Sequence, residues 1–262
     1  MADSMVGEVP EASPLDWAVA SRDAQVKTMV REALRDQRAV LAFQPVRQAR
    51  GGMLAFHEGL IRVLDETGRI IPAQDFMGEI ESDGLGRDID AAALRLGFQH
   101  LRARPDLRVS INVSARSLGD SLWRDALNEG LRMGEDVTAR MILEISEESA
   151  MLLPEVVIRF MEEMQPRGIS FALDDFGAGF TAFRYLKDFF FDLVKIDDIF
   201  VRGIENDPDN QVLAEALLTV AHQFDMFAVA EGVETEAEAE FLRSIGCDCL
   251  QGYHVGAPRL KV

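Results

Sequence analysis

Short apolar runs alternate with amphipathic stretches along most of the chain, from about residue 38 to residue 258. The first two apolar runs are separated by Arg50, Gly51 and Gly52, a composition that predicts a β-hairpin. The predicted strands lie at 39–45, 53–63, 107–114, 139–146, 169–175, 191–197, 226–234 and 247–253. The predicted helices between the later strands lie at 72–102, 118–133, 154–166, 179–187, 208–224 and 235–245.

Eight predicted strands with helices between them indicate an α/β fold, and in particular a TIM-like (β/α)8 barrel. The opening hairpin predicts that one early strand runs antiparallel to the others. No linker or change in composition divides the region from about 38 to 258. We therefore assign residues 38–262 to one barrel domain.

The N-terminal segment, residues 1–37, forms a separate extension in this scheme. Residues 1 to about 14 are rich in Pro, Ser, Glu and Gly, which is typical of a loosely held tail. Residues 15–37 carry apolar side chains at helical spacing and predict one or two helices that pack on the barrel. The apolar positions are Val26, Met29, Val30, Ala33 and Leu34. Both dimerisation and the recruitment of an unknown protein partner remain open as roles for these helices.

The formal net charge of −18 limits the classes of partner. It argues against a nucleic-acid polymer, whose phosphates are contacted by Lys and Arg, and against an anionic membrane surface. A small phosphate-containing substrate is compatible with this charge if divalent cations bind first. The charge taken alone is typical of a soluble protein.

The cysteine content and the termini indicate a reducing compartment. Cys247 and Cys249 lie two residues apart, where a bridge would be strained, so we expect two reduced thiols in the core. Without partner histidines they do not make a zinc site. No apolar run reaches the roughly 18 residues of a transmembrane helix, and the acidic N-terminus lacks the features of a secretory signal. A cytoplasmic location is expected.

Nearly every predicted strand ends in a charged or amide side chain. These residues are Gln44, Glu58, Asn112, Glu144, Asp174, Asp175, Lys195, Glu231 and Gln251. The carboxyl ends of barrel strands converge on one mouth, so side chains from distant parts of the chain are expected to meet there. Any one such carboxylate is more often a helix cap or a solvated turn residue, and only the repetition over most strands favours a functional site.

Five carboxylates and an asparagine at one mouth would repel one another unless cations bind between them. Carboxylate and amide oxygens suit hard divalent cations, and no histidine ends a predicted strand, so Mg²⁺ or Mn²⁺ fits better than zinc. Two such ions would activate a water and bind a phosphate oxygen. Adjacent Asp174 and Asp175 are suited to bridge two ions, and Glu231 could bind the second. Lys195 could orient the water or stabilise the transition state.

Several of these residues have a structural alternative. Gln44 alone could be a core amide with its hydrogen bonds satisfied. Glu147 and Glu148 could cap or lead into the helix that follows them. Asn112 and Ser114 could form a turn.

The spacing of the motifs adds a further inference. They are Glu58-Gly59-Leu60, Asn112-Val113-Ser114, Glu144-Ile145-Ser146-Glu147, Asp174-Asp175-Phe176-Gly177, Lys195-Ile196-Asp197, Ala230-Glu231-Gly232-Val233-Glu234 and Gln251-Gly252-Tyr253. In this order they resemble the EAL domain family of cyclic di-GMP phosphodiesterases, over about residues 39–258. The resemblance implies an α/β barrel with a two-metal site that hydrolyses cyclic di-GMP to linear pGpG.

The resemblance also implies a role for each matching residue. The first metal ion would be bound by Glu58, Asn112, Glu144 and Asp174. The second would lie among Asp174, Asp175 and Glu231. The catalytic residues would be Lys195, Glu231, Gln251 and Glu147, of which Glu147 holds a mobile loop near the interface of a homodimer. The substrate contacts would be Gln44, Leu60 and Arg62, with Arg62 suited to a phosphate oxygen.

Two departures from the family pattern leave an alternative open. Gly59 stands where the family has alanine, and the added backbone freedom predicts a looser Glu58. The loop at 178–183 lacks several of the family's hydroxyl groups. The first hypothesis is therefore an active phosphodiesterase, and the second is a catalytically weak or inactive cyclic di-GMP receptor or protein-interaction module. An unrelated Mg²⁺-dependent barrel enzyme would require the order of the motifs to be chance.

Overall fold

The computed structural model describes residues 14–179 and 183–261. Its strands are β1 (Ala39–Gln48), β2 (Leu54–Leu64), β3 (Ile70–Pro72), β4 (Val109–Asn112), β5 (Met141–Ser146), β6 (Ser170–Phe176), β7 (Leu193–Ile196), β8 (Phe227–Ala230) and β9 (Cys249–Leu250). Its α-helices are α1 (Pro14–Arg35), α2 (Met77–Ile80), α3 (Gly84–Ala103), α4 (Ser121–Leu131), α5 (Glu135–Thr138), α6 (Glu147–Leu152), α7 (Pro154–Met164), α8 (Phe183–Leu186), α9 (Pro208–Gln223) and α10 (Glu236–Ser244).

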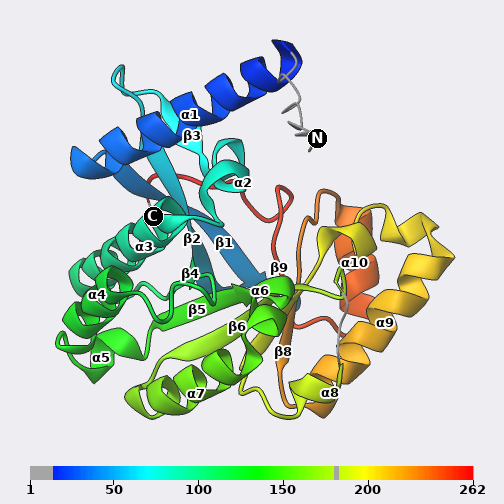
Figure 1. The fold of residues 1–262 in the computed structure, drawn as a ribbon. Helices are drawn as coiled ribbons and strands as arrows, with labels where there is room; N and C mark the ends of the chain where they lie inside the picture. Colours follow the sequence, from blue (N-terminus) through cyan, green and yellow to red (C-terminus); the bar gives the residue numbers. More distant parts are fainter. Residues whose placement is uncertain (1–13, 180–182, 262) are drawn as a thin grey trace, which may run out of the picture.

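The sheet closes on itself as a barrel. Its strand order is β1-β9-β8-β7-β6-β5-β4-β2, and β1 pairs with β2 to complete the ring. Strand β1 is antiparallel to both of its neighbours, whereas the pairs from β2–β4 round to β8–β9 are parallel. Helices surround this barrel in Figure 1, with α1 lying outside the ring. The predicted α/β barrel with one antiparallel strand is confirmed.

The stretch predicted as one helix over 72–102 is divided in the structure. Strand β3 extends the free end of β2, with Val63 opposite Ile71. The turn between the two strands is held by Asp65, whose Oδ1 accepts hydrogen bonds from the backbone N–H groups of Thr67 and Arg69. The long helix α3 begins only at Gly84. A three-residue strand is too short to produce an alternating pattern, which is why the sequence did not predict it.

Two other predictions differ from the structure or fall partly outside it. Glu147 and Glu148 lie in the first turn of α6, a helix that was not predicted. The alternative that these two residues lead into a helix is therefore correct as to where they lie. Of the helix predicted at 179–187, the structure describes α8 and not residues 180–182. The tail at 1–13 also lies outside the described residues.

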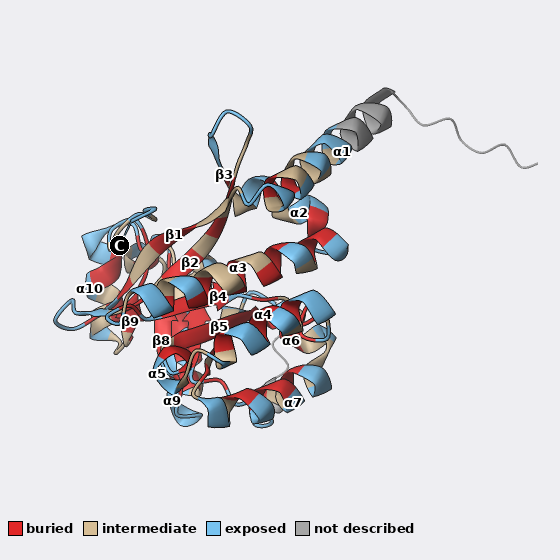
Figure 2. Ribbon diagram, turned by 90° about the vertical axis from the view of Figure 1, so that its left-hand side faces the viewer, coloured by how far each residue is buried: buried red, intermediate tan, exposed pale blue. Residues whose placement is uncertain are grey.

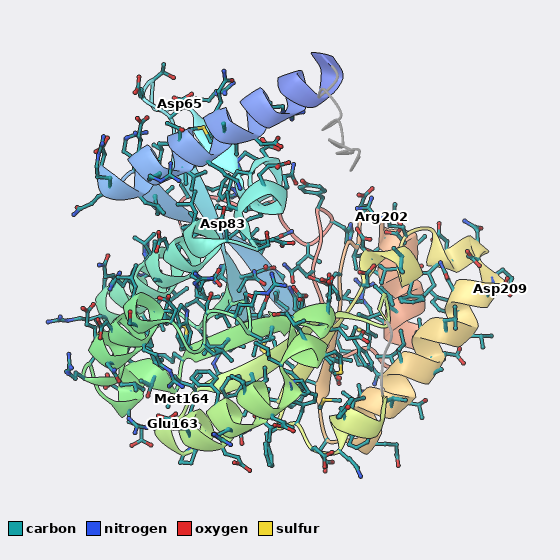
Figure 3. All side chains as sticks on the ribbon, viewed as in Figure 1. Asp65, Asp83, Glu163, Met164, Arg202 and Asp209 are labelled. Atoms are coloured by element: carbon teal, nitrogen blue, oxygen red, sulfur yellow. The ribbon has the colours of Figure 1, made fainter. Side chains whose placement is uncertain are left out.

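Side-chain caps explain where several helices begin. Asp83, labelled in Figure 3, accepts a hydrogen bond from the Leu85 backbone N–H at the start of α3. Asp120 and Asp207 cap α4 and α9 in the same way, and Thr235 with Glu238 forms a capping box on α10. Asp83 also pairs with Lys27 of α1 at 3.0 Å. With Val30 and Ala33 buried, this pair fixes α1 against the barrel domain, as predicted for the N-terminal helix.

The buried side chains form two groups. The larger one fills the space between the helices and the outside of the barrel, where Figure 2 shows buried residues on the strands and on the inward faces of the helices. The smaller one is an apolar layer inside the barrel, made by Val46, Phe56, Ile142, Ala172, Leu193, Val229 and Cys249. Cys247 and Cys249 are buried free thiols, as predicted. Within the described chain, no helix is both long and apolar enough to cross a membrane.

Candidate active site

The residues predicted at strand ends gather at the mouth of the barrel, but Gln44 and Glu58 lie within β1 and β2 and not at their ends. A pocket of about 410 Å³, the mouth pocket, is lined among others by Gln44, Glu58, Asp174, Asp175, Lys195, Glu231 and Gln251. Asn112 and Glu144 line a second pocket of about 350 Å³. A hydrogen bond of 2.8 Å from Asn112 Nδ2 to Glu58 Oε1 joins the two. Residues that are up to about two hundred positions apart in the chain are therefore neighbours, as the barrel geometry requires.

Lys195 lies at the centre of this group. Its side chain is only 1% exposed, and its Nζ contacts four carboxylates. The distances are 3.2 Å to Glu58, 3.0 Å to Glu144, 3.2 Å to Asp174 and 2.7 Å to Glu231. Burial by itself lowers the pKa of Lys195, but the surrounding carboxylates, Asp174 first among them, raise it well above its ordinary value. The ammonium group therefore stays protonated at neutral pH.

Glu58 is held on both sides by amides. Asn112 Nδ2 donates to Glu58 Oε1, and Gln251 Nε2 donates to Glu58 Oε2 at 2.5 Å. Gln251 Nε2 also lies 3.3 Å from Gln44 Oε1, which ties Gln44 into the same network. Burial raises the pKa of Glu58, but the charge of Lys195 and these hydrogen bonds outweigh it, so the net pKa is lowered. Glu58 is thus an ionised carboxylate with a fixed orientation.

Glu144 and Glu231 show the opposite balance. Burial raises the pKa of Glu144 to about 8, and burial followed by the charge of Asp174 raises the pKa of Glu231 well above its ordinary value. Glu144 Oε1 is buried and has no hydrogen-bond partner among the described residues. A buried carboxylate oxygen without a partner is costly, and a bound cation would remove that cost. Both raised pKa values favour protonated carboxyl groups in the metal-free protein, and a cation bound beside them would displace those protons.

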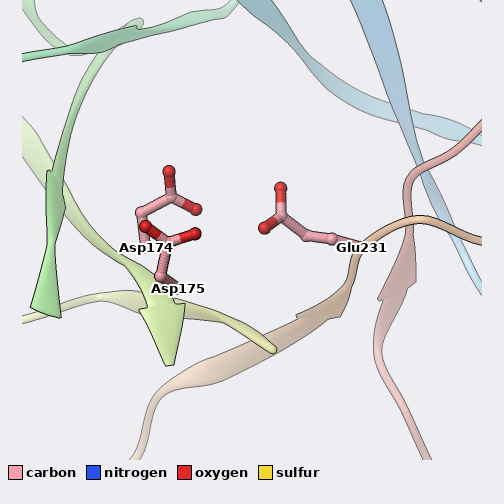
Figure 4. Close-up of side chains that lie close together, drawn as sticks. All are labelled: Asp174, Asp175 and Glu231. Carbon is pink, nitrogen blue, oxygen red and sulfur yellow. The ribbon is translucent and has the colours of Figure 1, made fainter. Parts of the chain in front are cut away.

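A local distortion of β6 brings two adjacent carboxylates to the same site. Neighbouring residues of a regular strand point to opposite faces. Here the pairing of β6 with β7 shifts register between Leu173 and Phe176, and Asp175 has a φ of 56° in the left-handed region. Asp174, Asp175 and Glu231 each offer an oxygen within 4.8 Å of the others, and Figure 4 shows both aspartates turned toward Glu231. Such strain is typical of functional sites.

Glu147 lies outside the mouth pocket and acts on a loop. Its side chain is 2% exposed, and its Oε2 accepts a hydrogen bond of 3.0 Å from the backbone N–H of Gly177. Gly177 has a φ of 96°, and a side chain there would collide with Leu217 and Phe200. Glu147 therefore fixes the start of the loop that follows Asp174 and Asp175. Residues 180–182 of the 178–183 loop, whose altered sequence was noted, lie outside the described residues.

The three predicted substrate contacts occupy different positions. Gln44 and Leu60 line the mouth pocket. Glu58, Leu60 and Arg62 occupy every second position of β2 and so share one face of the strand. Arg62 is not among the residues that line the mouth pocket. It is half-buried, its Nη1 donates to the Ile61 carbonyl oxygen at 2.9 Å, and burial lowers its pKa.

The profile of the EAL domain family matches residues 27–258. This chain belongs to the EAL domain family. It is 30% identical to cyclic di-GMP phosphodiesterase NbdA of Pseudomonas aeruginosa over 244 residues, which are 91% of this chain and 31% of NbdA. It is also 30% identical to cyclic di-GMP phosphodiesterase PdeR of Escherichia coli over 235 residues, 88% of this chain and 35% of PdeR. The chain thus spans about a third of the length of these relatives.

A solved structure supports the same fold. The PaMucR phosphodiesterase, in a complex with c-di-GMP, matches with a TM-score of 0.82 at 29% identity, over 90% of this chain and 97% of that one. This likeness supports the barrel fold of the chain.

The glycine in this chain's version of the EAL motif is tightly packed. Gly59 pairs with Phe43 on β1 and follows Glu58, which pairs with Ser110 on β4. A Cβ atom on Gly59 would lie 2.7 Å from Ile111 Cδ1, so the Ile111 side chain already fills that space. This packing argues against the prediction that Gly59 makes the backbone at Glu58 looser.

The amino-acid pattern of the EAL motifs did not reveal every residue near the site. Asp90 on α3 lines the same pocket as Asn112 and Glu144, and it is 7% exposed. It falls on the buried face of α3 with Leu94, Gly97 and Leu101. The available signal was a lone carboxylate on the apolar face of an amphipathic helix. At the rim, Arg202, labelled in Figure 3, pairs with Asp198 and Glu234 instead of with the central carboxylates.

The donor set fits divalent cations. Glu58, Glu144, Asp174, Asp175 and Glu231 are five carboxylates at one mouth, and Lys195 is the cation in direct contact with four of them. All of the candidate ligand atoms are oxygens, as Mg²⁺ and Mn²⁺ prefer.

Proposed function

We propose that this EAL domain hydrolyses cyclic di-GMP to linear pGpG with two divalent cations, Mg²⁺ or Mn²⁺. The observation that carries the proposal is the uneven charge of the barrel mouth, where five carboxylates face one ammonium group. When all five are ionised, the excess of four negative charges equals the charge of two divalent cations. Binding of the ions would displace the protons that the raised pKa values of Glu144 and Glu231 favour in the metal-free protein. NbdA and PdeR are named cyclic di-GMP phosphodiesterases, and PaMucR was solved with c-di-GMP, which supports the same substrate here.

The residues that would hold the two ions overlap at one position. Glu58, Asn112, Glu144 and Asp174 would bind the first ion, and Asp174, Asp175 and Glu231 would bind the second. When bound, the ions supply a polarised water and positive charge beside a phosphate oxygen. The shared ligand Asp174 and the strained Asp175 backbone keep the two sites close together.

Lys195 would act as a hydrogen-bond donor in this reaction. Its raised pKa keeps the ammonium group protonated, so it is unsuited to be a general base. It would donate to the attacking water and to the phosphate as negative charge develops there. Attack of water forms a new bond from the water oxygen to phosphorus and breaks one bond from phosphorus to a ribose oxygen. The ribose oxygen leaves as a hydroxyl group with a proton that the water gives up, so the ring opens and a terminal phosphate remains.

Other residues would orient the substrate and the ligands. Gln44 and Leu60 would contact the nucleotide from the wall of the mouth pocket, and Arg62 would reach a phosphate from the same face of β2. Gln251 would keep Glu58 in place from the side opposite Asn112. Glu147 would couple the loop after Gly177 to the metal site.

The test is direct. Purified protein is incubated with cyclic di-GMP and Mg²⁺ or Mn²⁺, and pGpG is followed by liquid chromatography, with a chelator as the metal-free control. We expect turnover that requires the metal. Binding of cyclic di-GMP without turnover would favour the alternative, a catalytically weak or inactive receptor or protein-interaction module, for which the altered loop at 178–183 is the motivating feature.

The assembly and location of the protein are further parts of the proposal. Homodimerisation, which the resemblance implies, would be checked by light scattering across a concentration series. A protein partner bound through the N-terminal helix and a location in the cytoplasm stay predictions from the sequence.

A further inference from the structure

Asp90 holds the segment that follows β4. Its Oδ2 accepts two hydrogen bonds, one of 3.0 Å from the backbone N–H of Ser114 and one of 2.6 Å from the Ser117 hydroxyl group. Both donors lie just beyond Asn112, the last residue of β4. Burial raises the pKa of Asp90 to about 6, which measures the cost of keeping this carboxyl group away from water. The two hydrogen bonds from Ser114 and Ser117 offset part of this cost and fix the segment that contains them.

The same segment is held at a second point and along its strand. The Ala115 backbone N–H donates to Ser149 Oγ of α6 at 2.7 Å. The Val113 backbone N–H donates to the Glu144 carbonyl oxygen at 2.8 Å, which continues the pairing of Asn112 with Glu144. Asp90 thus fixes one side of a short segment whose other side is attached to α6 and β5. Without Asp90 the Ser114 N–H would lose its partner.

The orientation of Asn112 depends on this segment. The Asn112 side chain spans from β4 to Glu58, and its Nδ2 must lie within hydrogen-bond reach of Glu58 Oε1. A small rotation of the backbone at 112–114 would swing the amide away from Glu58. Asp90, Asn112 and Glu144 also line the same pocket.

We propose that Asp90 is a positioning residue, which sets the affinity of the first metal site by holding Ser114 and thereby the amide of Asn112. The proposal rests on the proposed metal-dependent function. It is separable from it because metal affinity can be measured without substrate. The group held by Asp90 is backbone next to a ligand, so the effect should be near the lower end of the range for partners of metal ligands, about tenfold in affinity.

The experiment measures Mn²⁺ affinity of the whole chain by titration calorimetry, without nucleotide, for Asp90→Ala, Asp90→Asn and Ser117→Ala. Asp90→Ala should lose about tenfold in affinity at the tightest site. Asp90→Asn keeps a side-chain oxygen that can accept from Ser114 and should recover most of that loss. Ser117→Ala removes only the hydroxyl donor and leaves the Ser114 bond, so it should bind Mn²⁺ nearly as the wild type does.

A matched control separates positioning from stability. Asp192 accepts a hydrogen bond of 2.8 Å from the Phe171 backbone N–H at the opposite end of the barrel. Asp192→Ala should lower the unfolding temperature without changing Mn²⁺ affinity. If Asp90→Ala folds and binds Mn²⁺ as the wild type does, the proposal is overturned. If Asp90→Ala does not fold, the other two variants decide. The proposal is then overturned if Asp90→Asn binds Mn²⁺ at least tenfold more weakly than the wild type does, or if Ser117→Ala loses as much affinity.

The outcome for the wild type distinguishes this proposal from the function on which it rests. A wild-type chain that binds no Mn²⁺ and produces no pGpG refutes the proposed function, and Asp90 with it. A wild type that binds Mn²⁺ while Asp90→Ala binds equally well refutes only the role of Asp90.

Discussion

The two ends of the barrel use the same residue types for opposite purposes. At the mouth, carboxylates on β2, β5 and β6 and just after β8 face one another around Lys195. At the other end, a pocket of about 780 Å³ has an apolar floor that includes Phe56, Ile142 and Val229. The carboxylates there each accept from a backbone N–H, Asp192 from Phe171 and Asp248 from Ala228.

The carboxylates at the two ends differ in what their oxygens contact. A carboxylate that accepts backbone hydrogen bonds has its negative charge stabilised by those donors and does not require an ion. At the mouth, carboxylates share a single ammonium group, and an oxygen of Glu144 has no partner among the described residues. The larger pocket is therefore not the better candidate for the metal site, and carboxyl strand ends are where barrel enzymes carry their chemistry.

The largest expected effect is a loss of turnover when a carboxylate at the barrel mouth is replaced. Asp174→Asn removes the carboxylate proposed to bind both ions and should lower turnover by at least about a hundredfold. At the other end of the barrel, Asp248→Asn should change turnover by less than about twofold, because it alters a structural hydrogen bond. Both are measured as pGpG formed at saturating Mn²⁺. Equal losses in the two variants would contradict the division between the two ends.

The next effect concerns the stability of the metal-free protein. Lys195→Met leaves four carboxylates without their cation and should cost about 3–5 kcal/mol of the free energy of unfolding in a chelator. Saturating Mg²⁺ should return part of that loss, since ions bind the folded form. Urea unfolding with and without Mg²⁺ checks this. A destabilisation that Mg²⁺ leaves unchanged would argue against cation binding at these carboxylates.

A smaller effect on stability is expected from a substitution in the EAL motif. Gly59→Ala restores the family residue but places a Cβ atom 2.7 Å from Ile111 Cδ1, so it should cost about 1–3 kcal/mol of stability. Adding Ile111→Val removes the colliding methyl group and should recover most of the loss. Gly119→Ala, where a Cβ would meet nothing within 4 Å, is the control. Chemical denaturation measures all three, and a Gly59→Ala protein as stable as wild type would show that Ile111 can move aside.

The last expected effect is a pH dependence that belongs to Asp90. Its pKa is about 6 in the folded protein against an ordinary value of 3.8, so the folded form binds the extra proton. The stability of the wild type relative to Asp90→Asn should therefore fall as pH rises from about 4 to 6, by at most about 1.4 kcal/mol per pH unit. Above that window the difference should be flat. Unfolding in a chelator at several pH values checks it, and a difference that grew with rising pH would contradict the buried Asp90 carboxyl group.

The barrel could be predicted because its signal is distributed over the whole chain. Eight apolar runs separated by helical spacing left few folds to consider, and the closed sheet confirms that prediction. The short strand β3 and the helix α6 were missed, since both depend on contacts and caps rather than on periodicity. The candidate site could be predicted as a set, since strand ends must meet at one mouth. How those side chains pair could not be read from the pattern.

The order of apolar runs and strand-end polar residues was enough to determine the barrel, the group of residues at its mouth and the resemblance to the EAL family. Only the tertiary structure decided how those residues pair. It put Lys195 among four carboxylates, turned Asp175 into a left-handed conformation beside Asp174, filled the space at Gly59 with Ile111, and brought Asp90 of α3 to the segment behind Asn112. The physical reason is that periodicity reports which face of an element is buried, whereas charge balance, packing and backbone strain depend on which faces meet.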